Sequence, residues 1–175
     1  FSGLLMILLF ITYGRYMFML IIFLALVLAS IIVNLRLQNK RVIIFDWFEQ
    51  KFERHNTRFP WWGPTFYLLG ALLIATFLSE PKEIVSSIFI LAVGDGFSTL
   101  IGLKGRHKVP HNDKKTIEGS IAFFIVCLPL YLVIGEVAFP LAFLTSLTEA
   151  YSIKLEDNLT IPVVCVLFFR LIGGT

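Results

Sequence analysis

The stretch YMFMLIIFLALVLASIIVNL, residues 16–35, decides the fold class of this chain. It contains no charged side chain, and an α-helix needs about 20 predominantly apolar residues to cross the hydrocarbon core of a bilayer. The whole chain has the same character: 57% of its 175 residues are hydrophobic, 15% are charged, and its mean hydropathy is +0.83. Such a composition excludes an ordinary soluble domain and predicts an integral membrane protein.

Further apolar runs flank this stretch and are separated from it by charged clusters. They cover residues 1–13, 64–78, 84–101, 120–134, 137–151 and 159–172. The shorter runs fit partial or tilted helices. The sequence therefore predicts an all-α, polytopic fold with about seven transmembrane helices in a single membrane domain, residues 1–175. Because the chain opens on Phe1 rather than methionine, we expect residues 1–15 to be the remainder of a truncated first span.

The segment 38–59 has a different pattern, because its apolar and polar residues alternate with helical spacing. One face would carry Ile44, Phe45, Phe48 and Phe52, and the opposite face Asp46, Glu49, Gln50 and Glu53. This pattern predicts an amphipathic helix that lies in the membrane interface on the cytoplasmic side.

The basic residues indicate how the chain is oriented. If the spans alternate in direction, most lysines and arginines fall on one side of the membrane, and only Arg15, Lys82 and Arg170 fall on or toward the other. The positive-inside rule makes the lysine-rich side cytoplasmic. The formal net charge of +3 is too small to indicate a nucleic-acid partner.

Asp95 is the first candidate functional residue, because it interrupts the apolar run 84–101. A carboxylate inside a membrane span costs several kcal/mol unless it finds partners, so it marks a functional site by default. Gly94 and Gly96 flank it and permit close backbone approach. On a continuing helix, Ser98 and Thr99 would share its face and could bind a phosphate or a hydrated metal ion. A structural ion pair with a lysine of a neighbouring helix is the alternative.

A basic loop follows and ends where the next apolar helix begins. It contains Lys104, Arg106, Lys108, Lys114 and Lys115, then Thr116 and Glu118. Lysines and a helix N-terminus suit a polyphosphate, and a threonine hydroxyl suits a phosphate or a magnesium-bound water. The alternative is an ordinary cytoplasmic loop, with TIEG as a simple helix cap.

A third polar cluster lies in the stretch 145–158, where Glu149 shares a helical face with Thr145, Thr148 and Ser152, and where Asp157 follows. Together with Asp95 and Glu118, these residues supply four carboxylates from four segments. If they converge beside the lysine-rich loop, they provide the hard oxygen ligands that Mg²⁺ prefers.

Two weaker patterns remain. His107 and His111 are four residues apart but straddle Pro110, which argues against a metal pair. Cys127 and Cys165 lie far apart in apolar runs, so we expect small buried hydrophobes rather than a disulfide.

Three motifs, GDGFSTLIG (94–102), KKTIEGS (114–120) and TEAYSIKLEDNLTIP (148–162), together resemble the CTP-dependent lipid-alcohol kinases, the family of dolichol kinase, phytol kinase and fungal-type diacylglycerol kinase. The resemblance runs from about Trp62 to the end of the chain. KKTIEGS is shared with the related CDP-diacylglycerol synthases, but their later signature is absent after Ser120. The kinase interpretation therefore leads. A CDP-lipid synthase is the alternative enzyme, and a membrane transporter is the alternative from another class.

The resemblance implies that CTP binds with Mg²⁺ at the cytoplasmic surface, and that a lipid alcohol entering between the helices receives the γ-phosphate. The alcohol would be a polyprenol or dolichol, a phytol-like isoprenoid or a diacylglycerol. The implied catalytic residues are Asp95, Glu118 and Glu149, and Asp157 joins these three as metal ligands. The implied nucleotide contacts are Lys114, Lys115, Thr116, Gly94, Ser98 and Lys104. The oligomeric state is left open.

Overall fold

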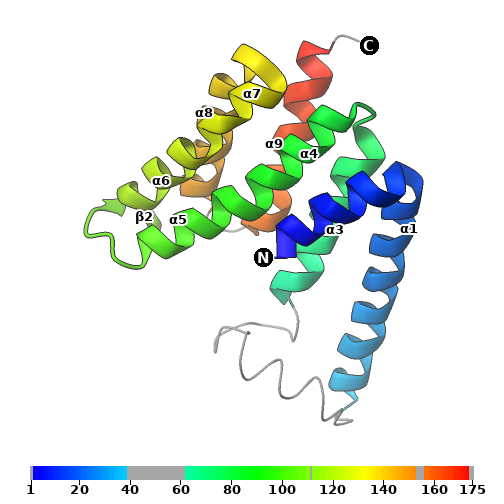
Figure 1. Cartoon of the computed structure of the whole chain (residues 1–175). Helices are drawn as coiled ribbons and strands as arrows, with labels where there is room; N and C mark the ends of the chain where they lie inside the picture. Colours follow the sequence, from blue (N-terminus) through cyan, green and yellow to red (C-terminus); the bar gives the residue numbers. More distant parts are fainter. Residues whose placement is uncertain (1, 39–61, 111, 153–155, 174–175) are drawn as a thin grey trace.

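The fold is described from a computed structural model, which describes residues 2–38, 62–110, 112–152 and 156–173. Helices make up nearly all of this part (Figure 1). The elements in chain order are α1 (Ser2–Leu37), α3 (Trp62–Phe77), α4 (Pro81–Phe89), the π-helix η1 (Ile90–Gly94), α5 (Asp95–Gly102), β1 (Lys108–Val109), β2 (Asn112–Thr116), α6 (Ile117–Cys127), the 3₁₀ turn η2 (Leu128–Leu130), α7 (Tyr131–Ile134), the 3₁₀ turn η3 (Gly135–Val137), α8 (Ala138–Tyr151) and α9 (Asp157–Ile172). The expected interfacial helix at 38–59 and the residue His111 lie outside the described residues, apart from a turn at Gln38.

Helix α1 is two arms joined at Gly14, and the chain turns back there (Figure 1). Gly14 has φ 73° and ψ 175°, a conformation open to glycine because it lacks a Cβ. Across the bend, the rings of Phe10 and Phe18 meet edge to face at 5.8 Å. Arg15 then donates from Nε to the Ala75 carbonyl at 2.8 Å, so its cation lies at the C-terminal end of α3. The bend separates the two apolar runs 1–13 and 16–35.

The middle of the molecule is a long helical rod formed by α4, η1 and α5 (Figure 1). Pro81 begins it at a position where a helix needs no backbone N–H. Ile84, Ile88 and Leu91 are fully buried, which places this rod in the core. Its path is α-helical except at residues 90–94, where the turn widens to a π-helix.

A helical hairpin, α6 and α8, packs against the rod. Gly135 has φ 68° and allows the chain to reverse between the two helices. Helix α6 crosses α5 closely, since a Cβ added at Gly119 would lie 2.8 Å from the Ser98 carbonyl oxygen. Helix α9 then closes the bundle against α3 and α8. Cys127 and Cys165 are free and buried in this core, which confirms the expectation of small buried hydrophobes.

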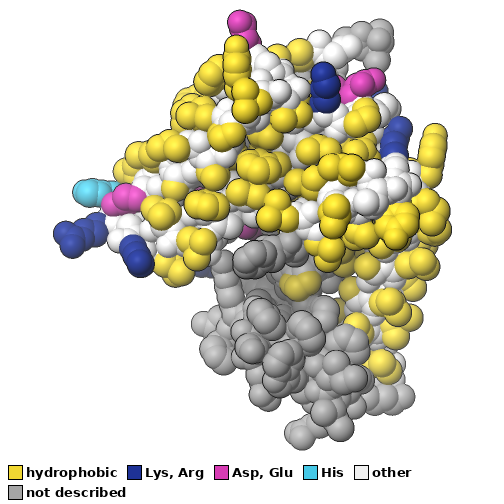
Figure 2. All heavy atoms as spheres, in the orientation of Figure 1, with side chains coloured by type: hydrophobic (Ala, Val, Ile, Leu, Met, Phe, Trp, Pro, Cys, Tyr) yellow, Lys and Arg dark blue, Asp and Glu magenta, His cyan; other side chains and the backbone are white. Residues whose placement is uncertain are grey.

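Three segments of the described chain are long and apolar enough to cross a membrane: Gly3–Leu35, Pro81–Gly102 and Ile117–Tyr151. Helix α3 and helix α9 have 16 residues each, fewer than the roughly 20 that a perpendicular span needs. The third segment is itself divided by the reversal at Gly135. Hydrophobic side chains cover most of the visible surface of the described residues, and basic side chains appear both at the end that carries the β-hairpin and at the opposite end (Figure 2). The protein is therefore a mostly helical bundle with three candidate membrane spans.

Candidate active site

Three acidic side chains from three helices meet at the hairpin end of the bundle. Asp95 begins α5, Glu149 lies in the last turn of α8, and Asp157 begins α9. Each offers one carboxylate oxygen, and these oxygens lie within 4.8 Å of one another. Glu149 is fully buried, whereas Asp95 and Asp157 are partly exposed. We call these three residues the carboxylate cluster.

Lys115 joins two members of the carboxylate cluster. Its Nζ donates to Glu149 Oε1 and, at 2.7 Å, to Asp157 Oδ2. Ser98 Oγ donates to the same Glu149 oxygen at 2.7 Å. A buried carboxylate is stable only when it is paired and hydrogen-bonded, and Glu149 meets both conditions. Desolvation lowers the pKa of Lys115, but Asp157 and Glu149 outweigh it, so the net pKa lies above the ordinary lysine value and the ammonium stays charged at neutral pH.

The π-helix η1 positions Asp95. A π-turn contains one residue more than an α-turn, and single π-turns occur often at functional sites. Gly94 ends this turn against α6: a Cβ there would lie 2.9 Å from Phe123 Cζ and 3.1 Å from Cys127 Sγ. Gly94 is thus a buried packing position, and it does not line the cavity described below.

The β-hairpin delivers Lys115, and Asn112 anchors that hairpin. Asn112 is 4% exposed and donates from Nδ2 to the Ala150 carbonyl at 2.8 Å, at the end of α8. This bond fixes β2 beside the buried Glu149, so that Lys115 can reach it. The motifs gave no indication of Asn112, because its partner is a backbone carbonyl far along the chain.

Thr116 has a structural task at the start of α6. Its Oγ1 accepts the Gly119 N–H at 3.2 Å and caps the helix. Three glycines make room for this side chain, since a Cβ at Gly105 would lie 2.6 Å from Thr116 Oγ1, and Cβ atoms at Gly102 and Gly119 would also crowd it. Thr116 is buried but still contributes to the cavity wall.

Glu118 bonds to the loop that precedes the hairpin and is not part of the carboxylate cluster. Its Oε1 accepts the Arg106 N–H at 2.9 Å and the His107 N–H at 3.1 Å, and His107 Nδ1 lies 2.8 Å from the same oxygen. In this arrangement Glu118 holds the backbone at the start of the hairpin.

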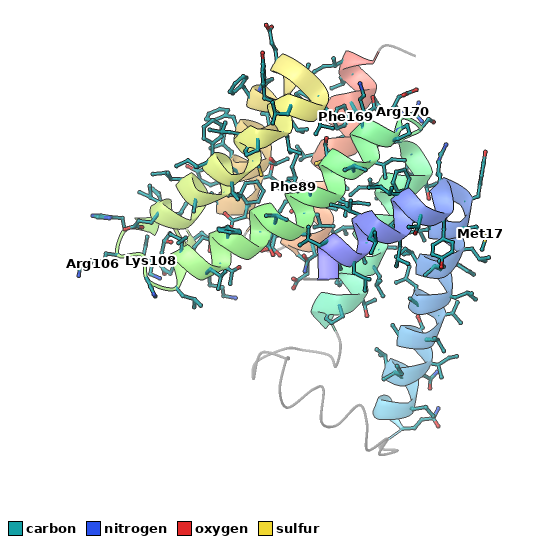
Figure 3. All side chains as sticks on the ribbon, viewed as in Figure 1. Met17, Phe89, Arg106, Lys108, Phe169 and Arg170 are labelled. Carbon is teal, nitrogen blue, oxygen red and sulfur yellow. The ribbon has the colours of Figure 1, made fainter. Side chains whose placement is uncertain are left out.

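A cavity of about 480 Å³ lies beside the carboxylate cluster. Its wall is formed by α5, the hairpin and the ends of α8 and α9, through Ser98, Thr99, Gly102, Leu103, Gly105, Lys108, Lys114, Lys115, Thr116, Glu149, Ser152, Glu156 and Asp157. The exposed Lys104 is not among these residues. Arg106 and Lys108 project at the hairpin end, far from Phe169 and Arg170 at the other end (Figure 3). Of the predicted site residues, the structure therefore brings together Asp95, Ser98, Lys114, Lys115, Thr116, Glu149 and Asp157, and it places Gly94, Lys104 and Glu118 outside this group.

The donor set fits a divalent cation. Three carboxylates and one ammonium leave a net formal charge of −2 at the cluster, and carboxylate oxygens are the ligands that Mg²⁺ prefers. The lysines of the hairpin add positive charge on the cavity wall beside it. In a bound metal polyphosphate, the metal ion would face the carboxylates and the phosphates would face the lysines.

Comparisons with known proteins found partial similarity to an uncharacterized protein and to proteins named phytol kinases. The uncharacterized protein MJ1137 of Methanocaldococcus jannaschii is 32% identical over 105 residues, which cover 58% of this chain and 54% of that protein. Phytol kinase 1, chloroplastic, of Arabidopsis thaliana is 38% identical over 65 residues, 36% of this chain and 21% of the kinase. Probable phytol kinase 1, chloroplastic, of Oryza sativa subsp. japonica is 25% identical over 134 residues, 64% of this chain and 42% of the kinase.

No family model matches the chain, and no solved structure matches it significantly. The chain spans about half the length of the first of these relatives and less of the kinases. Several distant relatives are nevertheless named phytol kinases. These partial similarities support a phytol-kinase-like family.

Proposed function

We propose that this protein is a CTP-dependent kinase that phosphorylates the hydroxyl of a membrane isoprenoid alcohol, such as phytol or a polyprenol. The observation that carries this proposal is the joining of Glu149 and Asp157 by Lys115, beside Asp95 and a lysine-lined cavity, in a bundle with an apolar exterior. A lipid kinase needs both a polyphosphate site and access to the membrane, and these features meet at one end of the molecule. The similarity to proteins named phytol kinases supports the same assignment.

The proposed roles follow from the positions of the side chains. Asp95, Glu149 and Asp157 would hold Mg²⁺, which when bound neutralises charge on the β- and γ-phosphates. Lys114 and Lys115 would bind the triphosphate as fixed cations on the cavity wall. Phosphoryl transfer requires mainly positioning and neutralised charge, and these residues can supply both.

Transfer of the γ-phosphoryl group needs no reactant besides CTP and the lipid alcohol. The lipid hydroxyl oxygen forms a bond to the γ-phosphorus, the bond from that phosphorus to the β-phosphate oxygen breaks, and CDP leaves. Asp95 lies at the start of α5 within the carboxylate cluster, and besides contributing to the metal site its carboxylate would orient the hydroxyl and receive its proton.

The proposal includes the topology. We place the hairpin end of the bundle at the cytoplasmic face, where CTP is available, because Lys104, Arg106, Lys108 and Lys114 lie in the hairpin and the loop before it. About seven membrane helices remain part of the proposal, in which the bilayer would thin locally beside the shorter α3 and α9 helices.

The decisive experiment uses CTP labelled at the α or the γ phosphate, with purified protein, Mg²⁺ and separate samples of phytol, geranylgeraniol, polyprenol, dolichol and diacylglycerol. Label from the γ position in an isoprenoid product is expected, and the Asp95→Asn variant should give none. Label from the α position in a sample with phosphatidic acid would replace the kinase with a CDP-lipid synthase. Transfer of γ label to diacylglycerol alone would overturn the isoprenoid acceptor.

A further inference from the structure

Ser98 is a buried residue of α5 whose side chain reaches another helix. It lies three residues after Asp95, so the two residues share a face of α5. Its Oγ donates at 2.7 Å to Oε1 of Glu149, which lies on α8 and 51 residues further along the chain. The side chain is well shielded, since Ser98 is only 3% exposed. This hydrogen bond therefore links the two helices that carry Asp95 and Glu149.

The backbone at Ser98 has little room to move. Helix α6 passes directly beside it, because a Cβ added at Gly119 would lie 2.8 Å from the Ser98 carbonyl oxygen and 3.3 Å from Gly102 Cα. A closely packed interior resists the small shifts that would separate two hydrogen-bonded side chains. The packing of α5 on α6 thus holds the Ser98 hydroxyl within reach of Glu149.

The resemblance implied that Ser98 contacts the nucleotide, but its hydrogen bond argues against that role. A serine hydroxyl has one proton, and in Ser98 this proton is directed at Glu149. A phosphate oxygen needs a donor, so Ser98 could bind one only by giving up its bond to a fully buried carboxylate. Removing a donor from a buried carboxylate is costly. Lys114, on the cavity wall, is the better partner for a phosphate.

The two carboxylate oxygens of Glu149 have different partners. Oε1 accepts from Ser98 Oγ and from Lys115 Nζ, which together use its two lone pairs. Oε2 lies 3.5 Å from Ser120 Oγ, which is longer than an ordinary hydrogen bond between a hydroxyl and a carboxylate. Oε2 therefore keeps lone pairs for a further partner, and Glu149 lies in the wall of the cavity.

We infer that Ser98 is a positioning residue for the metal site: by holding Oε1 of Glu149, it leaves Oε2 to bind the divalent cation. This inference rests on the proposed function, because the cation is the one that accompanies the triphosphate. Ser98 itself contacts neither the metal ion nor the nucleotide. Groups that hydrogen-bond to a metal-binding carboxylate fix its orientation, and their loss typically lowers metal affinity or activity by about 10- to 100-fold.

The test removes the Ser98 hydroxyl and compares the result with a matched deletion. Ser146→Ala is the control, because Ser146 is also buried, at 6% exposed, but donates to the Phe143 carbonyl of its own helix at 2.8 Å and does not line the cavity. Mn²⁺ serves as the probe, since carboxylates bind Mn²⁺ and Mg²⁺ alike. Electron paramagnetic resonance measures free Mn²⁺ during titration of the purified protein without nucleotide. The γ-phosphate transfer is measured separately against Mg²⁺ and CTP concentration.

We expect the dissociation constant for Mn²⁺ to rise about tenfold or more in Ser98→Ala, and the Mg²⁺ concentration for half-maximal transfer to rise with it. At saturating Mg²⁺, the KM for CTP should stay close to the wild-type value, because Ser98 does not contact the nucleotide. Ser146→Ala should match the wild type in both measurements. Ser98→Cys, which keeps nearly the same shape but has a weaker donor, should show a smaller rise, and it decides if Ser98→Ala fails to fold.

An unchanged Mn²⁺ affinity in Ser98→Ala would overturn the inference while leaving the kinase intact. A higher KM for CTP at saturating Mg²⁺, without a change in Mn²⁺ affinity, would instead make Ser98 a nucleotide contact. Equal losses of Mn²⁺ affinity in Ser98→Ala and Ser146→Ala would also overturn it, because they would indicate a general disturbance of the bundle.

Two results with the wild-type protein separate this inference from the proposed function. If the wild type does not bind Mn²⁺, the carboxylate cluster is not a metal site and the inference fails with it. If the wild type binds Mn²⁺ but transfers no γ-phosphate to any alcohol, the kinase proposal fails, and the role of Ser98 in the kinase metal site fails with it.

Discussion

Glu149 and Glu118 are two carboxylates that the sequence predicted for one site, and the fold gives them opposite surroundings. Glu149 is fully buried and is bonded to Lys115 and Ser98 beside the cavity. Glu118 is partly exposed and accepts hydrogen bonds from the backbone of Arg106 and His107, just before the hairpin. The difference shows that an acidic residue in a motif can serve either the chemistry or the scaffold that carries it.

The largest expected effect is the loss of Glu149. Glu149→Ala should abolish phosphoryl transfer and lower the free energy of unfolding by about 3 kcal/mol, because it leaves Lys115 in a partly buried site with one carboxylate fewer. Thermal unfolding in detergent and γ-label transfer measure the two effects. A variant as stable and as active as the wild type would remove the contrast with Glu118.

Lys115→Met should come next. It should raise the KM for CTP on the order of tenfold or more, because it removes a cation that reaches the cavity. The mild control is Lys104→Met, since Lys104 is exposed and does not line the cavity. Equal KM values for CTP in the two variants would reduce Lys115 to a structural partner of the carboxylates.

The pH dependence of stability sharpens the same comparison. The folded-state pKa of Lys115 is raised above 10.5 despite desolvation, because Asp157 and Glu149 favour its charged form. Its contribution to stability is therefore fully present below pH 10.5 and is lost as the pH rises through the folded pKa. We expect a steeper alkaline loss of stability above that pH in the wild type than in Lys115→Met, measured by thermal unfolding across a pH series. If the stabilities of the wild type and of Lys115→Met fall in parallel above pH 10.5, Lys115 is not the source of the alkaline loss.

Glu118→Gln should have a smaller effect. A glutamine oxygen can still accept the Arg106 and His107 N–H bonds, so we expect transfer to fall by less than roughly tenfold, with little change in the magnesium dependence. Titration of Mg²⁺ in the transfer assay checks this. If Glu118→Gln is as inactive as Glu149→Ala, or needs far more Mg²⁺, Glu118 belongs to the metal site as the sequence predicted.

At the two glycines next to Asp95, an added methyl group should change the free energy of unfolding in opposite directions. Gly94→Ala should destabilise by about 1 to 3 kcal/mol, because its Cβ would collide with Phe123 and Cys127. Gly96→Ala should be neutral or stabilise by up to about 1 kcal/mol, because its Cβ meets open space among the described residues. Thermal unfolding of both variants measures the difference. Equal stabilities would show that α6 shifts enough to make room for a Cβ at Gly94.

Much of the site could be predicted from local sequence because charges inside apolar runs are costly. Asp95 and Glu149 were identified as functional candidates for that reason, and Lys115 and Asp157 lay in motifs beside them. Asn112 could not be identified, because nothing near it in the chain shows that it bonds to the Ala150 carbonyl. The different partners of Glu149 and Glu118 depend on how α6 and α8 pack, which no motif records.

The sequence by itself determined that the chain is helical and apolar, and roughly where each helix lies, because hydropathy and charge act over neighbouring residues. Only the tertiary structure decided which helix ends meet. It also bent α1 at Gly14, widened the turn before Asp95 and divided the segment 117–151 into a hairpin. These choices depend on contacts between distant residues, such as Gly119 with the Ser98 backbone, where a single Cβ would prevent the approach.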